Sequence, residues 1–188
     1  MGGGGGSVNT GGGYGGGSAG TGVFSVLTPQ GGTTADLRNY HSALAYLSRD
    51  PWMRDIIARL HGSRTQYTVR FKSGTTLVDG FNDSTNSVNW DPTGSLWVGG
   101  CLSPALALGH ELAHADGYNY SAIRWWLKIL TPDNQYDNAE EKRVITGPEA
   151  SAAATLGEPR RYSHSVSKGD DRVESKSTSR SCNPRKMF

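Results

Sequence analysis

The spacing of apolar residues along the chain predicts two helices near the start of the folded part. Apolar side chains recur with helical spacing between residues 33 and 50, at Leu37, Tyr40, Leu44 and Leu47. A second helix follows directly, because Asp50 is placed as its N-cap and Pro51 at its first position. Gly62 is a typical residue to end it.

The pattern then changes to the alternation that is typical of strands. In TQYTVRFK, Tyr67, Val69 and Phe71 alternate with polar neighbours. Three shorter strands are predicted after it, in TTLVDG (75–80), NSVNWDP (86–92) and LWVGG (96–100).

A well-bounded helix is predicted next, from Ser103 as N-cap and Pro104 at the first helical position to Gly117 as the stop. The aromatic stretch 120–130 fits either a helix or a strand. Two further helices are expected, one over 139–147 with Asp137 or Asn138 as cap, and one over 149–158 opened by Pro148. We therefore expect an α+β fold with a small mixed sheet.

Composition limits the folded part to one domain. Hydrophobic residues are 35% of the 188, and half of the 26 glycines lie within residues 1–22. Such a segment has almost no side chains to bury, so nothing offsets the conformational entropy that it would lose on folding. We therefore expect disorder there. The serine-rich, charged stretch 165–188 is also expected to be disordered. One domain over residues 23–164 remains, and we expect a monomer.

Charge and cysteine content exclude several classes of function. The net charge of +2 includes no stripe of Lys and Arg, so we expect no nucleic-acid partner. The chain contains no run of 18 apolar residues, so we expect no integral membrane segment. Cys101 and Cys182 predict neither a disulfide framework nor a C-x-x-C metal site, which fits a reducing compartment.

The stretch LALGHELAHADGYN (106–119) carries the candidate chemistry. On a helix, His110 and His114 lie about 40° apart and can direct two imidazoles at one ion. Glu111 lies about 100° from His110, beside the ion, where its carboxylate can accept a proton from a water that zinc activates. This is the H-E-x-x-H pattern of zinc hydrolases. Two buried core histidines are the structural alternative.

A zinc hydrolase needs a third protein ligand. Asp116 points away from the metal face, and the longer histidine spacing fails because residue 120 is Tyr120. A glutamate on a later helix remains, and the candidates are Glu140, Glu141 and Glu149.

The run HELAHA, together with NAEEKRVITGPEASAAATLGEPRRYSH, resembles the NleD-like zinc metallopeptidase effectors that bacteria deliver by type III secretion. The likeness covers about 60 residues between Gly109 and His164, and NWDP (89–92) resembles a block upstream. The same blocks resemble the botulinum-type light chains, whose E-E-L-R-T-F-G stretch aligns Glu141 with the third ligand. Glu149 stays open as the alternative, because G-P-E follows here.

The resemblance implies a zincin fold, a Zn²⁺ cofactor and hydrolysis of a peptide bond in a host protein, reached by type III secretion into the host cytoplasm. It implies Glu111 as general base, and Arg161 as a group acting on the oxyanion or the substrate carbonyl. The family's aromatic position falls on His164, while the expected tyrosine stands two residues earlier, at Tyr162. A protein kinase is one expected substrate. The alternative is an inactive zincin that binds a host protein.

Overall fold

The computed structural model describes Met1 and residues 27–72, 79–164, 171–174 and 178. Apart from Met1, the glycine-rich segment 1–22 lies outside the described residues, as do 75–78 of the predicted strand 75–80. The mixed α+β class is confirmed, because helices pack on small sheets throughout the described chain.

The first two helices are confirmed. Helix α1 (Thr34–Leu47) begins with a capping box in which the side chains of Thr33 and Asp36 each bond the other's backbone N–H. Helix α2 (Pro51–His61) begins at Asp50, whose carboxylate accepts from Met53 N at 2.9 Å. The same carboxylate accepts from Ser151 and Thr155 through its other oxygen, so this cap also ties α2 to the last helix.

The main sheet is mixed, as expected, and has the order β1-β2-β4-β3. Strands β1, β2 and β4 are parallel, whereas β3 pairs antiparallel with β4 and forms one edge. The four strands are Leu27–Gln30 (β1), Tyr67–Phe71 (β2), Gly80–Asn82 (β3) and Ser87–Trp90 (β4).

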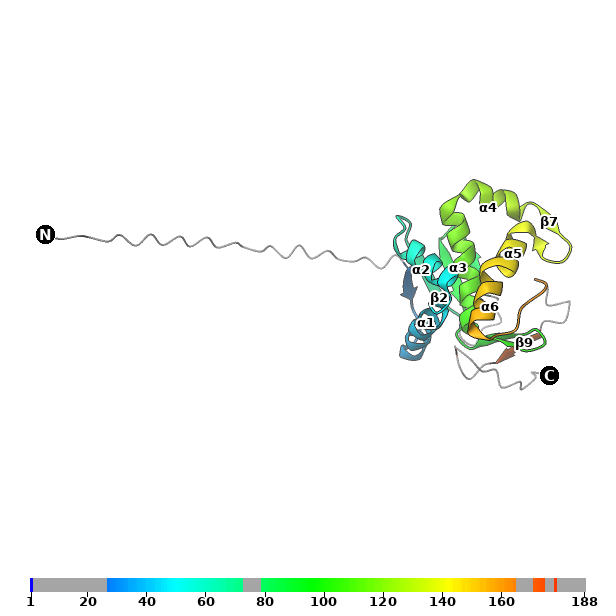
Figure 1. Cartoon of the computed structure of the whole chain (residues 1–188), viewed down its shortest axis with the longest axis horizontal. Helices are drawn as coiled ribbons and strands as arrows, with labels where there is room; N and C mark the ends of the chain where they lie inside the picture. Colours follow the sequence, from blue (N-terminus) through cyan, green and yellow to red (C-terminus); the bar gives the residue numbers. More distant parts are fainter. Residues whose placement is uncertain (2–26, 73–78, 165–170, 175–177, 179–188) are drawn as a thin grey trace.

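Helix α3 (Pro104–Tyr120) is the centre of the core. In Figure 1 it runs between α1 and α2 on one side and α5 and α6 on the other. Ser103 and Pro104 begin it as predicted. The expected stop at Gly117 is wrong, because the helix continues to Tyr120. Gly117 serves close packing instead: a Cβ there would lie 2.7 Å from Arg143 Nη2.

The segment after α3 is helical and returns across it. Its elements are α4 (Ala122–Ile129), the hairpin of β7 (Pro132–Asp133) and β8 (Asp137–Asn138), α5 (Ala139–Val144), η1 (Ile145–Glu149) and α6 (Ala150–Leu156). Asn138 caps α5. Gly147 has non-helical backbone angles (φ −104°, ψ −106°) and separates two helical segments, so Pro148 opens the second one as predicted.

A second sheet has the order β6-β5-β9, built from β5 (Gly94–Trp97), β6 (Cys101–Leu102) and β9 (Asp171–Glu174). The expectation of disorder from residue 165 onwards is therefore wrong for 171–174, and the folded part extends beyond residue 164. Strand pairing uses backbone groups, so a polar composition does not prevent it. Beyond it, the carbonyl of Thr178 accepts from Ala105 N at 3.0 Å.

The cysteine expectation is also corrected. Cys101 is disulfide-bonded, and Cys182 lies outside the described residues. The Cα atoms of two disulfide-bonded cysteines must lie within about 7 Å of each other. Separation along the chain does not reveal which cysteines come that close in space. A reducing compartment therefore does not follow from the cysteine count. Within the described ranges no helix combines the length and the apolar character needed to cross a membrane.

Candidate metal-binding site

The two histidines of the H-E-x-x-H pattern lie one turn apart in the buried part of α3. Every residue from Pro104 to Ala115 is buried, so the imidazoles are held by packing on all sides. His110 Nε2 and His114 Nε2 lie 3.0 Å apart. Both rings therefore direct the same nitrogen at one point.

Glu141 supplies a carboxylate at that point from a different helix. Asn138 accepts from the backbone N–H groups of Glu140 and Glu141, which sets the first turn of α5 against α3. Glu141 Oε2 lies 3.1 Å from His110 Nε2, and Glu141 Oε1 lies 3.3 Å from His114 Nε2. Oε2 is buried and makes no hydrogen bond with the described residues.

These separations fit a tetrahedral ion. Ligand atoms about 2.0–2.1 Å from a tetrahedral zinc lie about 3.3 Å from one another. The three contacts between the imidazole nitrogens and the carboxylate span 3.0–3.3 Å. The buried group of His110, Glu111 and His114 could hold a metal ion. Two imidazoles and the Glu141 carboxylate are donors of the type that zinc accepts.

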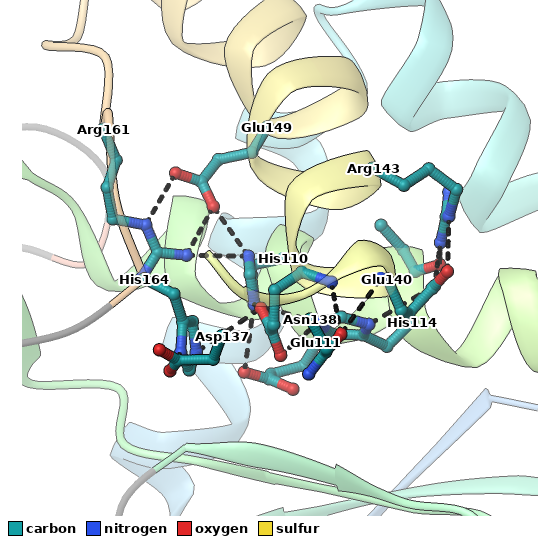
Figure 2. A network of polar contacts seen from close by, with 12 residues as sticks. His110, Glu111, His114, Asp137, Asn138, Glu140, Arg143, Glu149, Arg161 and His164 are labelled. Atoms are coloured by element: carbon teal, nitrogen blue, oxygen red, sulfur yellow. Dashed lines mark hydrogen bonds and ion pairs between the residues drawn. The ribbon is translucent and has the colours of Figure 1, made fainter. Parts of the chain in front are cut away.

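His110 is oriented from its other ring nitrogen. Glu149 Oε2 lies 2.6 Å from His110 Nδ1, and Arg161 Nη2 donates to the same carboxylate oxygen at 2.8 Å. Arg161 Nε also donates to Glu149 Oε1, at 3.2 Å. Glu149 thus meets His110 on the side away from Glu141, and Figure 2 shows it with Arg161 at that end of the cluster.

A carboxylate also lies near Nδ1 of His114, although this nitrogen makes no hydrogen bond with the described residues. Glu140 Oε1 lies 3.5 Å from His114 Nδ1, and the Glu140 side chain is fully buried. Arg143 holds Glu140 with a forked pair of hydrogen bonds, and its Nη2 also donates to Ala113 O at 2.8 Å. The consecutive residues Glu140 and Glu141 therefore face different nitrogens of one imidazole.

Glu111 lies beside the point where the ligands converge. Its Oε1 is 3.9 Å from His110 Nε2, and its side chain is 10% exposed. The carboxylate is therefore close to the candidate ion without occupying the space between the two imidazoles. This is the position that the 100° helical offset predicts.

His164 comes to the same cluster from the C-terminal segment. Its Nδ1 lies 2.5 Å from Asp137 Oδ2, and its Nε2 lies 3.4 Å from Glu141 Oε2. Its ring is stacked on that of His110. Tyr162 is not brought into the cluster: its side chain is 69% exposed, and its carbonyl accepts from Gln135 Nε2 at 2.6 Å.

The carboxylates around His110 favour the protonated form of its ring. Burial and the neighbouring Arg161 act to lower the pKa of His110. The carboxylates of Glu141 and Glu149 outweigh both and raise that pKa to about 10. Burial acts to raise the pKa of Glu141, but its two imidazole neighbours hold it well below its usual range. A metal binding here would displace the proton on His110.

Two residues of the site were not singled out from the sequence. Arg143 lies three residues after Glu140 on a predicted helix, a spacing that signals an ion pair but not its burial. The sequence favours Asp137 or Asn138 as the helix cap, and Asn138 performs that role. Its backbone is in the left-handed region (φ 68°), which no local pattern reveals.

Comparisons of the chain with protein-family models, with curated proteins and with solved structures found no match. The function proposed below therefore rests on the geometry of the site and on the sequence resemblance.

Proposed function

We propose that the protein is a zinc-dependent endopeptidase of the zincin type. The observation that carries the proposal is the convergence of His110 Nε2, His114 Nε2 and the Glu141 carboxylate within 3.0–3.3 Å, with Glu111 alongside. Two histidines and one glutamate are a known ligand set of catalytic zinc, whose fourth position is open to water or substrate.

When bound, zinc would polarise the substrate carbonyl and lower the pKa of water at the site. Glu111 would accept the proton of the attacking water at its carboxylate and pass it to the leaving nitrogen. Its burial supports this role, because a carboxylate shielded from bulk water keeps the proton at the reacting atoms.

Glu141 is the third ligand in this proposal, and Glu149 is a positioning residue. Glu149 lies at His110 Nδ1, where a carboxylate fixes the tautomer that leaves Nε2 free to bind the metal. Arg161 donates to both oxygens of Glu149, and its Nη2 also lies 2.9 Å from His110 Nδ1. Arg161 therefore has a structural contact in addition to the proposed action on the substrate carbonyl.

The proposed substrate is a protein bound in extended form. Strand β3 is an antiparallel edge of the main sheet and packs near α3, and a sheet edge can accept a peptide as an added strand. From the sequence resemblance we propose a host protein, with protein kinases as the first class to test, reached in the host cytoplasm by type III secretion.

Metal content tests the proposal first. The purified chain should contain about one zinc per molecule, and His110→Ala should contain much less, because one of three ligands is lost. His41→Ala, which removes an exposed histidine of α1, is the matched control and should retain zinc. Absence of zinc from the wild type after incubation with it at neutral pH would contradict the proposal.

Cleavage then separates the enzyme from a binding module. Host proteins incubated with the zinc-loaded chain should yield new termini by mass spectrometry, and the metal-free chain should yield none. A zinc-loaded wild type that binds a host protein but cuts nothing would favour the inactive zincin.

A further inference from the structure

His164 stands in the same relation to its surroundings as the two histidines of α3. Each of the three imidazoles has Nδ1 near a carboxylate: 2.6 Å from Glu149 for His110, 3.5 Å from Glu140 for His114 and 2.5 Å from Asp137 for His164. Each has Nε2 facing Glu141, at 3.1, 3.3 and 3.4 Å respectively. A histidine that binds a metal through one nitrogen almost always donates from the other to a carboxylate or carbonyl.

The contact between His164 and Glu141 calls for a cation between them. With Nδ1–H donated to Asp137, Nε2 of a neutral ring carries a lone pair, which is directed at a carboxylate oxygen. Two acceptors 3.4 Å apart repel unless a proton or a metal lies between them. The ligand atoms of His110, Glu141 and His164 all lie within 4.8 Å of one another, which is close enough to share one ion.

We propose that His164 is a fourth protein ligand of the metal, and that it closes the site in the resting protein. This inference rests on the proposed metal site and adds to it. Four protein ligands are typical of closed sites, whereas a catalytic zinc keeps a position open. His164 must therefore leave before a substrate can reach the metal.

Exposure identifies His164 as the ligand that can leave. Its side chain is 34% exposed, against 6% for His110 and 5% for His114. It lies on the segment 158–164 that follows α6, and its backbone N–H donates to Gln135 O at 3.2 Å. The other imidazoles belong to a buried helix and cannot move without disrupting the core.

X-ray absorption at the zinc edge of the full-length chain counts the coordinated imidazoles. The wild type should show three, and His164→Ala should show two while retaining zinc through the other ligands. His41→Ala is the control and should show three. Zinc with two imidazoles in the wild type would overturn the inference alone. A wild type that takes up no zinc would overturn the proposed function as well.

Asp137→Asn provides a second test. Asparagine tolerates the left-handed backbone of this position, so the variant removes the charge and keeps the turn. Loss of an outer-shell carboxylate should weaken zinc binding about 10-fold in competition with a chelator. His164→Ala should weaken it at least as much. Unchanged affinity in both variants would overturn the inference.

Discussion

At the scale of single residues, the two nitrogens of each imidazole have different functions. In His110, Nδ1 lies against Glu149 and Nε2 lies against Glu141. The carboxylates thus have two different roles. Glu149 orients the ring, and Glu141 lies beside Nε2 at the proposed metal position. Glu111 has neither role, and this leaves its carboxylate available for proton transfer.

Glu111→Gln should keep zinc and lose hydrolysis. The amide has nearly the same size and cannot accept the proton from water, so kcat should fall about 10²–10⁴-fold. Zinc content by elemental analysis and cleavage of an identified substrate are the two measurements. Loss of zinc would show that Glu111 serves the metal instead, and unchanged turnover would exclude it as the base.

Glu149→Gln should weaken zinc binding without abolishing it. The change removes the charge that orients His110 and leaves Arg161 without its ion-pair partner. Outer-shell losses of this kind cost about 10–100-fold in metal affinity, measurable by competition with a chelator. Asp55→Asn, at an exposed position of α2, is the control. If Glu149→Gln abolished binding altogether, Glu149 and not Glu141 would be the third ligand.

At the scale of elements, close packing against α3 places the site. Gly109 directly precedes His110, and a Cβ on it would lie 2.9 Å from Leu47 Cδ2 and 3.2 Å from Met53 Cε. Helices α1 and α2 approach α3 through this gap. Nearer the C-terminal end of α3, Gly117 allows the Glu140 and Arg143 side chains to lie against the helix.

Gly109→Ala should destabilise the fold although alanine is the better helix former. Propensity favours alanine by about 1 kcal/mol, but overpacking a buried contact costs about 1–3 kcal/mol. Denaturant unfolding should show that the free energy of unfolding falls by up to about 2 kcal/mol. Gly62→Ala meets only ordinary contacts, with Ala58 O at 3.4 Å, and should change stability by less than about 1 kcal/mol. Equal effects in the two variants would contradict the role assigned to Gly109.

At the scale of the whole molecule, the proposed ligands join segments that are far apart in the chain. His110 and His114 belong to α3, Glu141 belongs to α5, and His164 follows α6. An ion at this point would connect the central helix to the C-terminal half. A metal that binds the folded state and not the unfolded state stabilises the protein, and the stabilisation grows with the ratio of metal concentration to Kd.

A chelator should therefore lower the Tm of the wild type, and added zinc should restore it. With free zinc at about 1,000 times Kd, the folded state gains about 4 kcal/mol. Scanning calorimetry of His110→Ala provides the control, since that variant should not respond to the chelator. A wild-type Tm independent of chelator and zinc would argue against a bound metal.

Much of the local structure could be predicted from the sequence. Asp50 with Pro51 and Ser103 with Pro104 mark helix starts through cap bonds and a fixed φ, which act within a few residues. The alternation at 67–71 predicted β2 in the same way. The pair His110 and His114 follows from helical spacing alone, as does the position of Glu111 beside it.

Features that depend on distant segments could not be predicted from the pattern. Glycine after a helical run signals a stop, yet Gly117 lies inside α3 because Glu140 and Arg143 pack against it. The polar stretch 171–174 has no core-facing pattern and still pairs with β5. The resemblance pointed to Glu141 and left Glu149 open, and the two differ in which nitrogen of His110 they face.

The sequence by itself determined the helix that presents two imidazoles and a carboxylate, because capping and periodicity are local. Only the tertiary structure decided which carboxylate meets which ring nitrogen. That choice depends on how α5, the kink at Gly147 and the segment before His164 pack against α3. The proposed ligands lie up to 54 positions apart in the chain, from His110 to His164. A metal site requires their donor atoms to be placed accurately, and only the packing of these distant segments can do that.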